Sequence, residues 1–295
     1  MGARRQARQV AREITYAHSA QTRAGRAVIR TVENLTGRPR LIRLARDYEQ
    51  QVAQGHDFWA VMLQRYGLDL DILAGDLADI PRDGPLVVVS NHPFGILDGL
   101  VLGHVLRETR QDFRIVAHKV FNKAEEINRI ILPISFDPTK EAQRLNMDTR
   151  KAAISYLKQG GCIGIFPGGT VSTSTDDDAM PLDPRWRNFT AKMIVKSGAT
   201  VVPLYFHGAN SRRFQRASRL HYTLRMALLI SEFKARVGRK VPIALGQPIL
   251  PDQIRPYAND PTVLMEWLRA QTYSLSPDPI DPYAYGYEFE EQHKR

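Results

Sequence analysis

A length of 295 residues and a hydrophobic content of 43% indicate a folded chain with one large domain or two small ones. No apolar run approaches the roughly 18 residues that span a bilayer, so the sequence predicts that any membrane contact is peripheral. The single cysteine, Cys162, excludes an internal disulfide and a cysteine-based zinc site. Because it lies within an apolar stretch, we expect it to be buried and inert.

The positive charge is concentrated near the N-terminus. Residues 1–46 hold eleven arginines and two glutamates, a net charge of +9 out of +10 for the whole chain. A basic arm on a nearly neutral body points to an anionic surface, either acidic lipid or nucleic acid, although a solvated arm is also an option. Residues 1–12 carry four arginines with no apolar segment behind them, so we expect no secretory signal; a mitochondrial presequence is a minor alternative.

Hydrophobic periodicity predicts helices and strands that alternate along most of the chain. Residues 41–80 are expected to be helical. The elements that follow, in chain order, are strand 86–89, helix 97–106, strands 113–117 and 130–134, helix 139–159, strand 162–166, helix 185–197, strand 201–206, a helix around 214, strand 241–245 and helix 262–273. Such alternation favours an α/β fold with a mostly parallel central sheet flanked by helices on both faces. The Pro- and Tyr-rich residues 276–295 are expected to form a loose tail.

A polar turn between the first predicted strand and the next helix contains a candidate general base. His92 lies in this turn, and Asp98 follows six residues later. A neutral imidazole in a strand-to-helix loop can accept a proton, and a nearby carboxylate would fix its tautomer and stabilise the imidazolium. Alone, this pair is weak evidence, because an isolated histidine is more often structural.

Two further strands run into loops with binding potential. Pro167, Gly168, Gly169, Thr170 and Ser172 follow the strand 162–166, and such a loop can present backbone N–H groups to a phosphate or form an ordinary glycine turn. It lacks the lysine of a nucleotide-binding P-loop, which disfavours nucleotide hydrolysis. The strand 201–206 leads to Arg212, which could meet a phosphate or stay solvated. The acidic run 176–178 is expected to be a solvated loop, or else to attract a cationic headgroup.

These blocks resemble the glycerolipid (lysophospholipid) acyltransferase superfamily in content and order. The blocks are Asn91-His92 with Asp98, then Phe166-Pro167-Gly168-Gly169-Thr170, then Val201-Val202-Pro203-Leu204. The residues at 91–95 and 206–211 are similar in sequence to the bacterial branch of haemolysin-like and ornithine-lipid-type acyltransferases. The resemblance covers roughly residues 70–250. Together with the charge distribution and the predicted elements, it predicts a basic N-terminal helical region over 1–80 that faces the membrane, an acyltransferase domain over 81–275 and a loose tail over 276–295.

The resemblance also implies roles for these residues. His92 would be the base that takes the proton of an acceptor hydroxyl, and Asp98 would orient it. Residues Asn91, Pro167, Gly168, Gly169, Thr170, Ser172, Pro203 and Arg212 would contribute to substrate binding. The implied reaction moves a fatty acyl group from acyl-CoA or acyl-carrier protein to a lyso-lipid hydroxyl, with no metal and no other cofactor. The expected partner is an anionic membrane surface on the inner face of the cell membrane, reached from the cytoplasm, and nucleic acid is disfavoured.

Two positions depart from the family pattern. Five residues separate His92 from Asp98 where the family usually has four, and the extra residue could lie in the turn 93–95. Gly168 and Val171 stand where the family usually has glutamate and arginine, which disfavours lysophosphatidate as the acceptor and allows an amide-linked lyso-lipid such as lyso-ornithine lipid. Lys119, Lys123 and Lys140 are candidates for the family's second block. A thioesterase and a non-catalytic lipid- or nucleic-acid-binding protein of the same fold are the alternative hypotheses.

Overall fold

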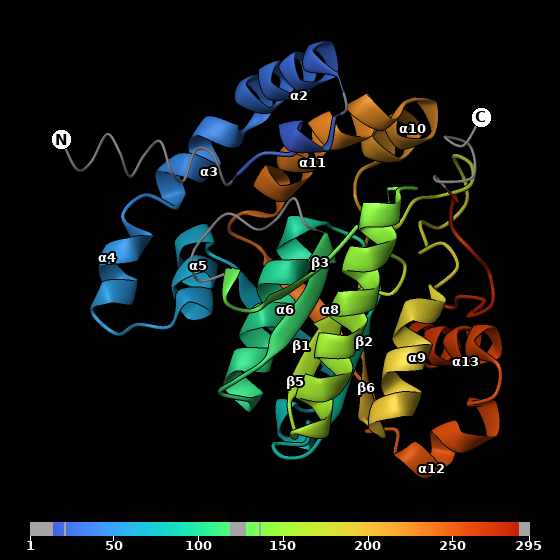
Figure 1. Cartoon of the computed structure of the whole chain (residues 1–295). Coiled ribbons are helices and arrows are strands. Elements are labelled where there is room, and N and C mark those ends of the chain that lie inside the picture. The colour runs from blue at the N-terminus through green and yellow to red at the C-terminus, as the bar shows by residue number, and fades with distance from the viewer. Residues whose placement is uncertain (1–13, 21, 119–127, 136, 289–295) are drawn as a thin grey trace.

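A mostly parallel sheet forms the middle layer of a three-layer α/β/α fold (Figure 1). The computed structural model describes residues 14–20, 22–118, 128–135 and 137–288. Within them the sheet has seven strands in the order β1-β7-β6-β2-β5-β3-β4, and only the β6–β7 pair is antiparallel. The strands are β1 (Asp69–Ala74), β2 (Leu86–Ser90), β3 (Arg114–His118), β4 (Ile131–Ile134), β5 (Cys162–Ile165), β6 (Thr200–Phe206) and β7 (Lys240–Leu245).

Helices cover both faces of this sheet. They are α2 (Arg23–Thr36), α3 (Arg38–Leu44), α4 (Tyr48–Ala53), α5 (Phe58–Tyr66), α6 (Ile96–Thr109), α8 (Lys140–Lys158), α9 (Asn188–Ser197), α10 (Arg212–Leu220), α11 (Tyr222–Arg236), α12 (Pro251–Ile254) and α13 (Pro261–Tyr273), with short 3-10 turns at 17–19, 77–79 and 255–257. Because strand side chains alternate, Leu86 and Val88 pack with α5, α6 and α11 on one face. Val87 and Val89 pack with α8, α9 and α13 on the other.

The structure confirms the predicted fold class and most predicted elements. β2 is buried along its whole length and is paired with a parallel strand on each side. β4 is an edge strand, which suits Pro133 because proline has no N–H to donate to a further strand. The Thr139 side chain accepts from the backbone N–H of Ala142 and caps the long helix α8. Cys162 is fully buried, and this burial raises the pKa of its thiol to about 12.

The structure differs from the expected elements at three places. Residues 69–74 are not helical: they form edge strand β1, which pairs with β7 some 170 residues later, so the sheet starts before residue 81. The helix expected around 214 is a pair, α10 and α11. The tail is bound rather than loose as far as Glu288, because its backbone hydrogen-bonds to residues 173 and 183. Residues 289–295 lie outside the described part.

Candidate active site

The loop from β2 to α6 brings His92 and Asp98 together. Nδ1 of His92 lies 2.9 Å from Oδ2 of Asp98, and the aspartate side chain is fully buried. The same oxygen accepts backbone N–H bonds from Phe94 (2.8 Å) and Gly95 (3.0 Å). The extra residue of the spacing is taken up in the turn 93–95, since α6 begins only at Ile96. The pairing predicted from the sequence is confirmed.

Glycine at position 95 is required by this turn. Its φ of 84° lies in the left-handed region, and a Cβ there would come 2.9 Å from the hydroxyl oxygen of Tyr16. That hydroxyl accepts the backbone N–H of Ile96 at 3.1 Å. Glu33 of α2 accepts from the Thr15 hydroxyl and the Tyr16 backbone N–H, both at 2.6 Å. A contact from the N-terminal region therefore forms part of the turn that presents His92.

The electrostatics of the pair suit a general base. Burial raises the pKa of the Asp98 carboxyl, and the hydrogen bonds from His92 and the two backbone N–H groups oppose that rise. The partner of Nδ1 assigns the imidazole proton to that nitrogen, so Nε2 is left as the acceptor. The His92 side chain is 19% exposed, and Phe166 stacks on its ring at 4.2 Å between centroids. A positive charge on the imidazole would compensate the buried carboxylate.

The glycine loop lies against the same turn. The backbone N–H of Ser172 donates to the carbonyl of His92 at 2.8 Å. The loop begins tightly, because Gly169 has a φ of 71° and donates back to the Phe166 carbonyl at 3.0 Å. The Pro167 carbonyl accepts the N–H of Arg187 at 3.0 Å. The residues 166–172 therefore form one wall beside the histidine.

A buried arginine on α11 holds this loop, and the sequence analysis missed it. Nη2 of Arg225 donates to the Thr170 hydroxyl (2.8 Å) and to the Val171 carbonyl (2.6 Å), and Nη1 donates to the Thr173 hydroxyl. Burial lowers the pKa of Arg225 to about 10. The available signal was an arginine directly before the apolar run 226–230, since a cation on a buried helix face needs oxygen partners.

The other predicted binding residues fall into different places. Asn91 ties β2 to β6: its amide donates to the Phe206 carbonyl at 2.9 Å and accepts the Phe206 N–H at 2.7 Å. Pro203 is buried within β6 opposite Val89. Arg212 is the exposed first residue of α10. Within the described part of the chain it has no hydrogen bond or ion pair with the His92 turn.

The other charged residues singled out from the sequence are the acidic run and three lysines. The acidic run is exposed, and Asp177 forms ion pairs with Arg216 and Arg219 of α10. Lys140 is the exposed first residue of α8, while Lys119 and Lys123 lie outside the described residues.

Comparison with known proteins finds the same motifs in a known family. The family model described as Acyltransferase matches residues 72–207, a segment that holds the His92 turn and the glycine loop. This match and the similar curated proteins support the resemblance to the glycerolipid (lysophospholipid) acyltransferase superfamily. The resemblance drawn from the motifs is confirmed.

Among similar curated proteins are two lyso-glycine lipid O-acyltransferases. The protein from Phocaeicola vulgatus is 23% identical over 215 residues, which cover 70% of this chain and 74% of that protein. The protein from Bacteroides thetaiotaomicron is also 23% identical over 215 residues, which cover 70% and 76%. A similar solved structure is the 1-acyl-sn-glycerophosphate (LPA) acyltransferase PlsC from Thermotoga maritima, with 17% identity, a TM-score of 0.41, and coverage of 84% of this chain and 82% of that one.

No helix in the described part of this acyltransferase has both the length and the apolarity needed to cross a membrane.

Proposed function

We propose that this chain is a lyso-lipid O-acyltransferase in which His92 is the general base. The observation that carries the proposal is the 2.9 Å contact between Nδ1 of His92 and the buried carboxylate of Asp98. In this mechanism Nε2 takes the proton of the acceptor hydroxyl as that oxygen attacks the thioester carbonyl carbon. The carbon–sulfur bond then breaks, and the thiolate leaves with the proton from the imidazolium. Asp98 stabilises the imidazolium between these steps.

The proposed acceptor is a lyso-lipid with an amino-acid headgroup, such as lyso-ornithine or lyso-glycine lipid. Val171 is apolar and 6% exposed, so it offers no cation to a phosphomonoester. Arg225 directs its N–H groups to three oxygens of the glycine loop and is fully buried. The names of the similar curated proteins favour an acceptor with an amino-acid headgroup. Acyl-CoA and acyl-carrier protein are both candidate donors.

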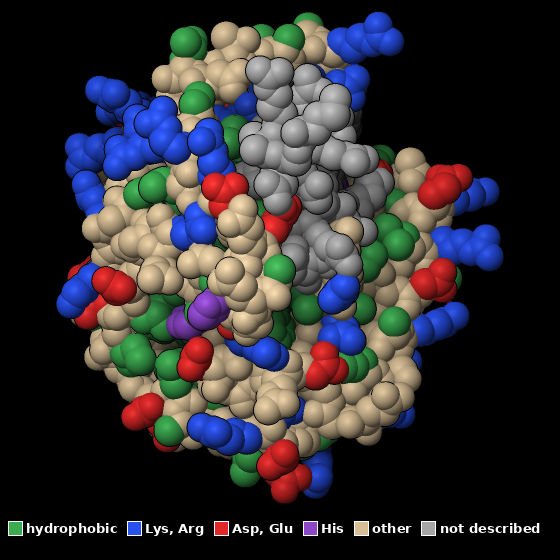
Figure 2. Space-filling model, turned by 90° about the vertical axis from the view of Figure 1, so that its left-hand side faces the viewer, with side chains coloured by type: hydrophobic (Ala, Val, Ile, Leu, Met, Phe, Trp, Pro, Cys, Tyr) green, Lys and Arg blue, Asp and Glu red, His purple; other side chains and the backbone are tan. Residues whose placement is uncertain are grey.

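The proposed location is an anionic membrane surface on the inner face of the cell membrane. On α2, Val28 is 46% exposed and Leu35 is 82% exposed. The start of α2 lies beside the start of α11, since a Cβ at Gly25 would be 3.7 Å from the Thr223 hydroxyl. The junction of α10 and α11 adds Leu220, which is 77% exposed. Lys and Arg side chains gather on the upper part of the neighbouring face, at the level of α2 and α3 (Figure 2). Exposed apolar side chains with arginines around them are typical of a surface that binds acidic lipid.

A transfer assay with the full chain tests the reaction. The donors are acyl-CoA and acyl-carrier protein, and the acceptors are lyso-ornithine lipid, lyso-glycine lipid and lysophosphatidate. We expect O-acylation of the amino-acid lipids, and we expect His92→Ala to abolish it, because the attacking oxygen loses its base. His56→Ala, at an exposed position between α4 and α5, is the matched control and should keep full activity.

Three results would contradict the proposal in different ways. An active His92→Ala variant would remove the base assignment. Free fatty acid released at the same rate with and without acceptor would indicate a thioesterase. Binding to vesicles without transfer to any acceptor would indicate a lipid-binding protein that has the fold without the reaction.

A further inference from the structure

Asp183 is a buried carboxylate that contacts both loops of the candidate active site. Its Oδ1 accepts the backbone N–H of His92 at 3.1 Å and the hydroxyl of Ser172 at 2.5 Å. Its Oδ2 accepts the indole N–H of Trp186 at 2.9 Å. The residue is completely buried. One side chain therefore joins the residue proposed as base to the glycine loop.

The glycine loop leaves space for this carboxylate. A Cβ at Gly168 would lie 3.2 Å from Oδ2 of Asp183 and 3.3 Å from its Cβ, which is tighter than ordinary van der Waals contact. A larger residue at position 168 would push against Asp183. The Asp183 carboxylate can therefore occupy its place only because residue 168 has no side chain.

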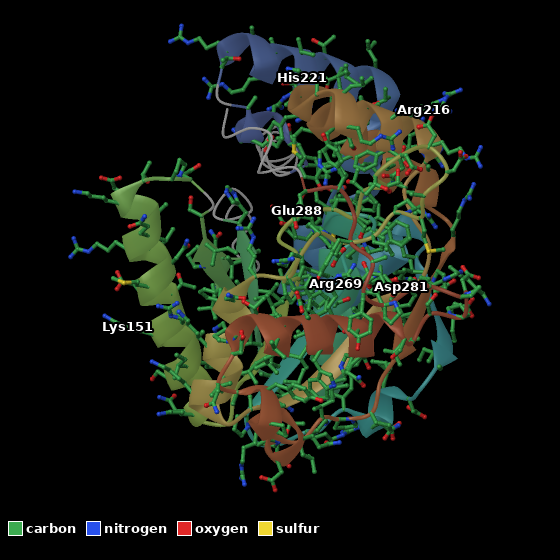
Figure 3. All side chains as sticks on the ribbon, turned by 90° about the vertical axis from the view of Figure 1, so that its right-hand side faces the viewer. Lys151, Arg216, His221, Arg269, Asp281 and Glu288 are labelled. Carbon is green, nitrogen blue, oxygen red and sulfur yellow. The ribbon has the colours of Figure 1, made fainter. Side chains whose placement is uncertain are left out.

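The main chain of Asp183 is fixed from the C-terminal side. Its N–H donates to the Tyr273 hydroxyl at 2.7 Å. Its carbonyl accepts from Arg269 at 3.0 Å and from the N–H of Gly286 at 2.9 Å. Figure 3 shows the C-terminal segment passing from Asp281 up to Glu288 on this side of the molecule, with Arg269 on α13 nearby. Both the backbone and the side chain of residue 183 are therefore held in one position.

We propose that Asp183 is a positioning residue. It holds the backbone of His92 where Nδ1 of the ring can contact the carboxylate of Asp98. The inference rests on the proposed function, because it assigns Asp183 a part in presenting the base. The backbone of His92 is bound on both sides: its N–H by Asp183 and its carbonyl by the N–H of Ser172. Asp98 fixes the ring, and Asp183 fixes the peptide that carries the ring.

The test is Asp183→Asn, which keeps the shape and removes one acceptor. An asparagine oxygen at the Oδ1 position can still accept from His92 and Ser172, but its NH₂ group then faces the N–H of Trp186. Turning the amide over places the NH₂ group against the N–H of His92 instead. Either arrangement has two donors in contact, so the turn shifts. We expect kcat to fall by about tenfold to a hundredfold with the donor KM within about threefold.

A second variant separates positioning from simple loss of stability. Trp186→Phe removes the indole donor, so the double variant Asp183→Asn/Trp186→Phe has no conflict between donors. We expect it to recover most of the lost kcat, although it loses more buried polar contacts than the single variant. Trp186→Phe alone should stay within about threefold of the wild type. Asp178→Asn is the matched control, since Asp178 is an exposed carboxylate in the loop that precedes Asp183.

Hydrogen–deuterium exchange of residues 90–98 gives a readout that does not need activity. We expect faster exchange in Asp183→Asn than in the wild type or in Asp178→Asn, and slower exchange again in the double variant. Unchanged exchange and unchanged kcat in a folded Asp183→Asn variant would overturn the inference, as would a double variant no better than the single one. If the wild type transfers acyl groups and His92→Ala does not, such a result leaves the proposed function standing. If the wild type transfers none, the exchange comparison still decides the role of Asp183.

Discussion

The carboxylate of Asp98 is the group on which the proposed base depends most directly. Two backbone N–H groups donate to its Oδ2 and Nδ1 of His92 lies 2.9 Å from it, while its Oδ1 has no hydrogen-bond partner among the described residues. Asparagine can keep the acceptor oxygen where these three groups lie and place its NH₂ group at the free position. The substitution Asp98→Asn therefore removes charge with little change of shape.

For Asp98→Asn we expect kcat to fall by about a hundredfold to a thousandfold, because the imidazolium loses its counter-charge. Steady-state kinetics against both donors measures this fall. The donor KM should change little, since the side chain of Asp98 is fully buried and is out of reach of the donor. A variant with wild-type kcat would mean that the charge of Asp98 is not used.

The same variant has a stability signature that depends on pH. Burial raises the pKa of Asp98 above its value in the unfolded chain, so the ionised carboxylate costs stability at high pH. That cost disappears as the pH falls through the folded-state pKa. Thermal unfolding of the wild type and of Asp98→Asn should therefore show that the variant gains stability relative to the wild type as the pH rises. The opposite trend would mean that the carboxylate is stabilised in the folded chain.

Arg225 provides a prediction about the glycine loop. Arg225→Lys keeps a cation but has fewer donors in a different geometry, so the three oxygens at Thr170, Val171 and Thr173 cannot all be satisfied. We expect a loss of about 1–3 kcal/mol in the free energy of unfolding, measured by urea denaturation. The acceptor KM should rise, because Thr170 loses the donor that fixes its hydroxyl. Arg216→Lys, at an exposed position on α10, is the control.

The C-terminal segment shows how one element can support a distant loop. Gly286 donates to the Asp183 carbonyl, and Tyr287 donates to the Thr173 carbonyl at 2.9 Å. A chain that ends at Asp281 loses both bonds and keeps α13. We expect it to fold with a lower melting temperature and a lower kcat, measured by calorimetry and the transfer assay. Unchanged kcat would mean that Asp183 is held well enough by Tyr273 and Arg269.

The sequence predicted those helices and strands that can be recognised from their own residues. β2, β5 and β6 are short apolar runs at the centre of the sheet, and α8 has a cap, an apolar face and a glycine stop, so each could be recognised from its own residues. β1 could not, because edge pairing with β7 decides its structure, although the alternation of residues 69–72 has the period of a strand.

The site was predictable to the same extent. The His92 turn and the glycine loop lie at the ends of β2 and β5, and adjacent parallel strands bring their carboxyl ends together. Asp183 and Arg225 are 91 and 133 positions from His92 in the sequence, and long-range folding alone brings them to it. Their contacts depend on tertiary structure that no local pattern encodes.

The whole molecule has an asymmetric distribution of charge and exposed apolar surface. The exposed Arg23 and Arg26 of α2, with its exposed apolar side chains, predict binding to acidic vesicles that weakens as salt increases. Arg23→Gln with Arg26→Gln should lower partition onto such vesicles by roughly thirtyfold, at roughly 1 kcal/mol for each arginine. Flotation of the variant and of the wild type measures the change. Equal flotation on neutral and acidic vesicles would mean that these charges are not used.

The hydroxyl of Tyr16 reaches the first turn of α6, and Glu33 of α2 fixes the backbone of Tyr16. The segment that faces the proposed lipid surface is therefore also a structural part of the turn that presents the proposed base. A chain shortened to begin at Arg38 would lose the proposed lipid-binding surface of α2. It would also lose the contact of Tyr16 with the first turn of α6. Any shortened form of this protein for assay or crystallisation should begin before residue 14.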